Sequence, residues 1–254
     1  MTLPCRPTAA PQPVALVVAV LVVVAALAVV TPSAQSPAPP EVRQIVTFRF
    51  VPGRAAEAIS IYECRLKPVY EDTAPLLRFR AYREAESPEP LDLVVVSSYQ
   101  GMAGMDAAND ALRARHRSGV AAFEVYGELS GMTTAHHDQF VEMLPRRGEP
   151  PADGLTVFEY LKLTPGSGRA FERLLAETIE PFEHERGIYQ GSESGRLIVA
   201  DGWDYLRMHG IRSLADWHAA VTAARGATFQ SSLDPLVAAR KVIILRVDAR
   251  LSVR

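Results

Sequence analysis

The sequence predicts an α+β fold made of two similar halves. Two Pro-Gly pairs, Pro52-Gly53 and Pro165-Gly166, lie 113 residues apart, and each opens a helical segment that closes at a second proline, Pro68 or Pro181. The spacing within the two segments is the same. An apolar, strand-like run precedes each pair, at 45–51 and at 157–163. This shared spacing predicts one strand–turn–helix unit present in two copies.

The first half shows the order β-α-β-β-α-β in its hydrophobic pattern. Val, Ile, Phe and Thr fill the first strand on both of its alternating faces, which is typical of a strand covered on both sides. The predicted strands are 43–51, 75–82, 91–97 and 137–144. One predicted helix follows Pro52-Gly53. A second predicted helix spans 102–117, and whether it continues through 120–129 is left open.

The second half repeats this order after a linker rich in proline and glycine. Its predicted strands are 155–163, 188–192, 196–203 and 241–247, and its predicted helices are 167–186, 214–224 and 232–240. The resulting domain plan has a leader at 1–34, a tether at 35–42, repeat 1 at 43–144, a linker at 145–154 and repeat 2 at 155–254.

A β-α-β-β-α-β unit is the ferredoxin-like arrangement, an antiparallel sheet with two helices on one face. Its other face stays bare, although strands that are apolar on both faces need a second cover. Two such sheets packed face to face meet this need. The sequence therefore predicts two tandem ferredoxin-like repeats that form an α+β barrel within one chain.

The N-terminal segment has the layout of a secretory signal peptide. Residues 14–30 form an uninterrupted apolar run, Arg6 precedes it, and small residues follow it. We expect an exported protein, periplasmic or extracellular. The alternative is an uncleaved membrane anchor, because the run is at the lower limit for crossing a bilayer. A net charge of −2 gives no reason to expect a nucleic-acid partner. The sequence leaves open whether the protein forms a homo-oligomer.

Three stretches of the second half resemble the dimeric α+β-barrel superfamily, in particular its NIPSNAP-like and antibiotic-biosynthesis-monooxygenase-like members. These stretches are 158–166 (FEYLKLTPG) followed by Phe171, 203–205 (WDY) and 213–217 (SLADW). The resemblance implies the barrel fold. It leaves the activity open, since the superfamily holds cofactor-free oxygenases, haem enzymes and members without catalysis.

Aromatic side chains are the candidates for a ligand site between the two sheets, because small-molecule pockets are mostly apolar with a few placed polar groups. The predicted ligand-binding residues are Phe48, Tyr160, Trp203, Tyr205 and Trp217. The alternative for each is ordinary core packing.

Candidate catalytic residues are His184, His218 and Tyr189. The sequence predicts no metal site, and it contains neither a phosphate-binding glycine loop nor a serine nucleophile elbow. His136 and His137 are neighbours in a predicted strand, so they should point to opposite faces and cannot bind one metal together. We expect no cofactor. Haem is the one alternative that the resemblance implies, with His184 or His218 as the axial ligand.

These observations favour an exported protein that binds a small apolar or aromatic molecule and has no recognisable catalytic motif. One alternative is an oxygenase, with or without haem, that acts on an aromatic or quinol-like substrate. The other is a structural or protein-interaction module, in which side chains would fill the space between the sheets.

Overall fold

The structure is a computed structural model that describes residues 39–72, 75–88, 90–117, 122–145 and 148–253. Residues 39–254 form one compact unit. The expected leader at 1–34, and the tether up to residue 38, lie outside the described residues. Among the residues that are described, none of the helices is both long and apolar enough to cross a membrane.

Each half of the unit contains four strands, and helices separate the first strand from the second and the third from the fourth. The first half comprises β1 (Glu41–Phe50), α1 (Ala55–Ile61), η1 (Tyr62–Leu66), α2 (Lys67–Glu71), β2 (Leu76–Glu86), β3 (Leu93–Gln100), α3 (Gly101–Arg117), α4 (Ala122–Ser130) and β4 (Thr133–Met143). The second half comprises β5 (Leu155–Leu163), α5 (Gly168–Leu174), η2 (Leu175–Ile179), α6 (Glu180–Glu185), β6 (Gly191–Val199), β7 (Tyr205–Ile211), α7 (Leu214–Arg225), α8 (Gln230–Leu233), η3 (Asp234–Leu236) and β8 (Val237–Val247).

The eight strands form a closed, antiparallel barrel in the order β1-β3-β2-β8-β5-β7-β6-β4. Within each half, the first strand lies between the half's third and fourth strands. Two seams join the halves, β2 with β8 and β4 with β6. The closed barrel leaves no strand edge among these eight unpaired, so the sheet needs no further protection against edge-to-edge association.

The two halves also agree in the irregular part of their first helices. The π-helical segment η1 interrupts the first helix of the first half at Tyr62–Leu66. The π-helical segment η2 interrupts the corresponding helix of the second half at Leu175–Ile179. These segments are separated by the same 113 residues as the two Pro-Gly pairs. A π-helical turn is rare, so its recurrence at one offset is informative.

Side chains fill the centre of the barrel. The buried residues of this interior cluster come from seven of the strands and include Ile45, Tyr82, Val96, Val141, Phe158, Met208 and Leu245. Leu197 of the remaining strand, β6, packs against them. Near one end, Arg43 of β1 makes two hydrogen bonds of 2.7 and 2.8 Å to the Glu193 carboxylate of β6. The middle of the inter-sheet space is therefore packed core.

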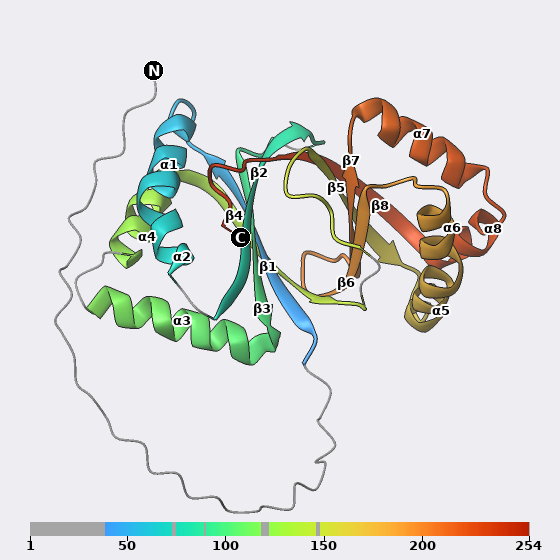
Figure 1. Ribbon diagram of the computed structural model, residues 1–254, viewed down its shortest axis with the longest axis horizontal. Coiled ribbons are helices and arrows are strands. Elements are labelled where there is room, and N and C mark those ends of the chain that lie inside the picture. The colour runs from blue at the N-terminus through green and yellow to red at the C-terminus, as the bar shows by residue number, and fades with distance from the viewer. Residues whose placement is uncertain (1–38, 73–74, 89, 118–121, 146–147, 254) are drawn as a thin grey trace, which may run out of the picture. The chain divides into compact units, whose positions relative to one another are not determined.

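Helices cover the outer faces of the barrel in two separate layers. Figure 1 shows α1, α2, α3 and α4 on one side of the strands, and α5, α6, α7 and α8 on the other. Phe171, Leu175 and Ile179 anchor the second layer, and Tyr62 and Leu66 anchor the first.

The structure corrects three of the elements expected in the second half. The strands expected at 188–192 and 196–203 both overlap β6 (Gly191–Val199), residues 200–204 form a turn, and the strand after this turn, β7 (Tyr205–Ile211), was not expected. The helix expected at 232–240 is short, because strand β8 already begins at Val237.

Candidate functional site

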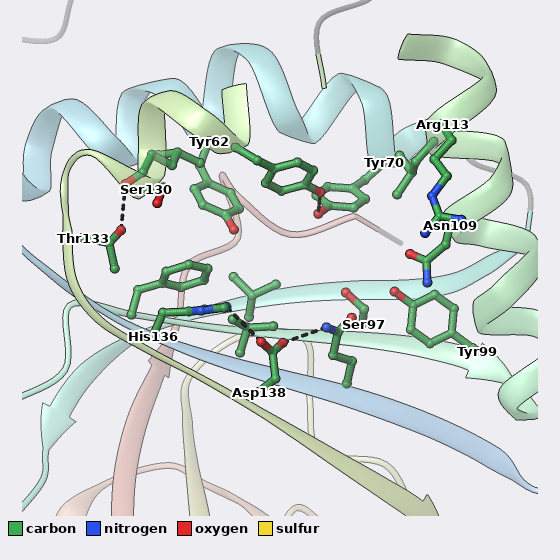
Figure 2. A pocket seen from close by; sticks show the side chains of 17 residues that line it. Tyr62, Tyr70, Ser97, Tyr99, Asn109, Arg113, Ser130, Thr133, His136 and Asp138 are labelled. Carbon is green, nitrogen blue, oxygen red and sulfur yellow. Dashed lines mark hydrogen bonds and ion pairs between the residues drawn. The ribbon is translucent and has the colours of Figure 1, made fainter. Parts of the chain in front are cut away.

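A cavity of about 500 Å³ lies between the helices of the first half and the outer face of its sheet. This size falls within the usual range for small-molecule sites. Strands β1, β3 and β4 form its floor, and helical segments form its roof and one end. Figure 2 shows side chains from both layers pointing into this space.

Tyrosines dominate the roof and one side of the cavity. Tyr62 and Tyr70 extend from the helical segments after Pro52-Gly53, Tyr126 from α4 and Tyr99 from the end of β3. The hydroxyl groups of Tyr70 and Tyr126 bond to each other. Burial raises the pKa of Tyr62 and Tyr70 well above the usual value, with neighbouring tyrosines adding to the effect. These phenols therefore stay neutral and can donate or accept hydrogen bonds.

A histidine–aspartate pair lies on the floor. His136 Nε2 is 2.9 Å from Asp138 Oδ2, and the Gln44 amide donates a 2.7 Å hydrogen bond to Asp138 Oδ1. Because an ionised carboxylate only accepts hydrogen bonds, Nε2 of a neutral His136 carries the proton and Nδ1 carries the lone pair. The His136 ring also stacks on Phe48, with 5.3 Å between ring centroids. Asp138 and Phe48 thus orient the half-exposed His136 side chain at the cavity edge.

The two ends of the cavity differ in chemistry. In Figure 2 His136 lies toward one end with Asp138 next to it on the floor, and Asn109 and Arg113 of α3 lie at the other end, near Tyr99. Val46 and Val95 of the floor and Leu112 of α3 add apolar surface to the cavity. A flat molecule with polar groups at both ends and an apolar middle matches this distribution.

Several solved structures have a similar fold. A candidate monooxygenase from Lactobacillus acidophilus matches with a TM-score of 0.61 and 10% identity, over 82% of this chain and 94% of that one. An anthrone oxidase-like protein matches with a TM-score of 0.53 and 12% identity, over 82% and 91%. A chlorite dismutase mutant from Candidatus Nitrospira defluvii matches with a TM-score of 0.52 and 12% identity, over 81% and 91%.

The chain shares the α+β-barrel fold of these proteins. At such low identities the likeness concerns the fold alone. No family model matches the chain, and no curated protein sequence matches it. The barrel predicted from the sequence is therefore confirmed as a fold class, and the activity has to be argued from the site.

The five predicted ligand-binding residues do not share one cavity. Tyr160 and Trp203 lie together at one mouth of the barrel, where a hollow of about 370 Å³ remains between the sheets. Phe48 lines the cavity under the first helix layer. Tyr205 packs on Phe171 in the second helix layer, and Trp217 of α7 packs near Tyr189. The interior cluster occupies the middle of the inter-sheet space, so these five residues lie in separate places, and ligand binding by any of them stays a prediction.

The predicted catalytic residues separate in a similar way. His184 and Tyr189 both line a hollow of about 330 Å³ beside α6. His218 lies exposed on α7. Whether any of these residues takes part in catalysis remains a prediction.

Haem does not fit at either predicted axial histidine. The hollow beside exposed His184 is bordered by Glu180 and Glu183, which would oppose the negatively charged propionates of haem. Buried apolar side chains fill the adjoining space under the second helix layer, including Leu163, Phe171, Leu175 and Phe229. Haem ligation depends on the pocket around the axial ligand; the hollow beside His184 is bordered by two glutamates, and His218 is exposed on α7.

Sequence reasoning did not identify the tyrosines or Asp138 as a site. Two of the tyrosines, Tyr62 and Tyr70, lie eight residues apart; Tyr62 is within the segment predicted from Pro52-Gly53 to Pro68, and Tyr70 comes just after it. The sequence does predict that His136 and His137 point to opposite faces of their strand, and this prediction is confirmed. In the structure His136 lines the helix–sheet cavity and His137 lines the barrel mouth.

Proposed function

We propose that this protein binds a hydroxylated, planar aromatic molecule in the cavity of the first half and oxidises it with molecular oxygen, without an obligatory cofactor. The single observation that carries the proposal is the oriented His136–Asp138 pair at the edge of a cavity lined by neutral tyrosines. The neighbours described as monooxygenase and anthrone oxidase-like share the fold and support the same direction.

The residues that line the cavity account for binding of the aromatic ligand. Aromatic faces of the ligand would pack against Phe48 and the apolar floor, and the hydroxyl groups of Tyr62 and Tyr99 would exchange hydrogen bonds with phenol or ketone oxygens. Because burial keeps Tyr62 neutral, this side chain can donate to a phenolate that forms on the ligand.

The chemistry needs a base more than it needs a cofactor. His136 Nδ1 would remove a proton from an activated ring carbon of the anthrone type, and the resulting electron-rich anion would pass electrons to O₂. The oxygen adduct takes the proton back from His136 and loses water. The balance is R₂CH₂ + O₂ → R₂C=O + H₂O, in which the substrate supplies all the electrons.

The matched pair His136→Gln and His137→Gln tests the proposal. The two residues are neighbours in β4 but face different hollows. With 1,8-dihydroxyanthrone as the probe, O₂ uptake by the His136→Gln variant should fall by about 100-fold or more, the low end of what a general base contributes. The His137→Gln variant should keep its rate within about twofold.

Binding is measured separately by quenching of tyrosine fluorescence and by thermal shift. Binding without O₂ uptake by the wild-type protein would refute the oxidation and favour binding without catalysis, which is the function that the sequence favoured. If the wild-type protein neither binds the probe nor takes up O₂, the cavity is not the functional site.

We also propose that the two halves are tandem copies of one ferredoxin-like unit. The shared β-α-β-β-α-β order, the equivalent strand order and the recurrence of the π-helical segment after 113 residues support it. Under this proposal the helix–sheet cavity of the first half has a counterpart in the second half.

A further inference from the structure

Three polar residues on neighbouring strands of the second half form a hydrogen-bonded chain. Ser192 of β6 lies directly opposite His209 of β7, and Glu159 of the adjacent strand β5 pairs with Arg207, two residues along from His209. All three side chains are on the barrel face that the second helix layer covers. They are separated by 17 to 50 residues in the sequence.

The contacts determine which atom donates and which accepts in each of these hydrogen bonds. The Ser192 hydroxyl bonds to His209 Nδ1, and His209 Nε2 lies 3.3 Å from Glu159 Oε2. Ionised Glu159 only accepts, so Nε2 of neutral His209 carries the proton and donates it. Nδ1 is then the acceptor for the serine hydroxyl. A carboxylate orients an imidazole, and the imidazole accepts from a hydroxyl, which is the order of groups in an activated serine nucleophile.

The surroundings maintain these charge states. Burial by itself would raise the pKa of Glu159, but the His209 hydrogen bond and the guanidinium groups of Arg240 and Arg207 outweigh it and lower that pKa to about 2. Burial and the charge of Arg207 lower the pKa of His209. The histidine is therefore neutral at physiological pH.

Ser192 is accessible, whereas His209 and Glu159 are enclosed. The hollow of about 330 Å³ beside α6 is lined by Ser192 and Tyr189, and the Tyr189 ring stacks on His209 with 4.1 Å between centroids. His209 has no exposed surface. A molecule that enters the hollow reaches the serine hydroxyl first and cannot bypass it to reach the base.

The rim of the hollow indicates the class of molecule. Glu180 and Glu183 border it, so an anionic acyl group is disfavoured. Arg207 donates a 2.6 Å hydrogen bond to Glu183, which holds that carboxylate against the wall. The volume suits a short, uncharged acyl group.

We propose that Ser192 is the nucleophile of a second, hydrolytic site that takes short uncharged carboxylic esters, with His209 as its base and Glu159 as the group that positions His209. Ser192 Oγ attacks the ester carbonyl while its proton passes to His209 Nδ1. The ester C–O bond breaks, and that proton leaves with the alcohol. Water then releases the acid by the same route, so ester and water give acid and alcohol.

A fluorophosphonate probe applied to the folded full chain tests this directly. The serine Oγ–P bond would form with loss of fluoride, adding one group per chain at Ser192, as located by peptide mass spectrometry. Ser192→Ala should abolish labelling at this site, because the nucleophilic oxygen is removed. Ser194→Ala is the matched control, because Ser194 lies on the same face of β6 but bonds to Glu180 at 3.3 Å and not to a histidine.

Ser192→Cys provides a second readout that does not depend on ester chemistry. A thiol beside His209 should react with iodoacetamide at least about tenfold faster than a thiol placed at residue 194, because a neighbouring imidazole favours the thiolate. Absence of label on the folded wild-type chain, or equal labelling of the Ser192→Ala variant, would overturn the proposal. Neither result would bear on oxidation in the first half, which is measured with a different probe.

Discussion

Glu159 is held ionised inside the protein, and this has a consequence for stability in acid. Its pKa is about 2 in the folded state against 4.5 for an unperturbed glutamate. The unfolded chain therefore binds more protons than the folded one between these values, and stability must fall with pH there. The contribution of Glu159 is complete above pH 4.5 and is lost as the pH drops toward 2.

We predict that the free energy of unfolding declines by roughly 3 kcal/mol from this group between pH 4.5 and 2, on the linkage relation of 1.36 kcal/mol per pKa unit. Urea unfolding at a series of pH values measures it. In the Glu159→Gln variant, whose amide does not titrate, the decline over this window should be shallower. An unchanged slope would show that Glu159 is not held ionised by His209, Arg207 and Arg240.

At the scale of elements, two glycines create the recess in which the linker between the halves lies. Gly191 of β6 and Gly210 of β7 are cross-strand partners. A Cβ atom on Gly191 would lie 2.1 Å from the carbonyl oxygen of Glu149, and one on Gly210 would lie 2.3 Å from Pro151 Cδ. The linker can therefore lie against the strands here because both partners lack a side chain.

We predict that Gly191→Ala lowers stability by about 1–3 kcal/mol, the usual cost of overpacking, because the added methyl group meets backbone and not a flexible side chain. The control is Gly127→Ala in α4, where a Cβ has open space and alanine is the better helix former, so stability should rise by up to about 1 kcal/mol. Thermal unfolding measures both. If the two substitutions changed stability equally, contact with the linker would not explain the effect of Gly191→Ala.

Strands β6 and β7 show why sequence patterns predicted some elements and missed others. β5 was predicted to the residue because it is a continuous apolar run that the core buries. In β6, Ile198 and Val199 are more than half exposed, so their hydrophobicity extended the predicted strand into the turn. In β7, Arg207 and His209 interrupt the apolar pattern. Their burial depends on Glu159 and Glu183, partners that only the folded chain brings together.

At the scale of the whole molecule, the same reasoning explains which part of the site was predictable. Two sheets with apolar faces imply a barrel, and the sequence predicted it. The sequence does not determine where packing leaves space. Large side chains such as Phe158 and Tyr82 fill the barrel, whereas the first helix layer stands off from the sheet over Val46 and Val95. The cavity therefore lies on the face opposite to the expected one.

The interior cluster makes the two halves one cooperative unit. Phe158 of the second half packs edge-on against Tyr82 of the first, with 5.3 Å between ring centroids, and it is only 1% exposed. Either half alone would expose its side of this cluster.

We predict that Phe158→Ala costs about 3–5 kcal/mol, the usual cost for a buried phenylalanine, and that both halves lose this stability together. Both tryptophans, Trp203 and Trp217, are in the second half, so their fluorescence reports its unfolding, while hydrogen exchange of β1 and β3 reports the first. The two probes should give one urea midpoint in the wild-type protein and one lower, still shared midpoint in the variant. If Phe158→Ala shifted only the tryptophan transition, the halves would be separate folding units and the barrel interior would not couple them.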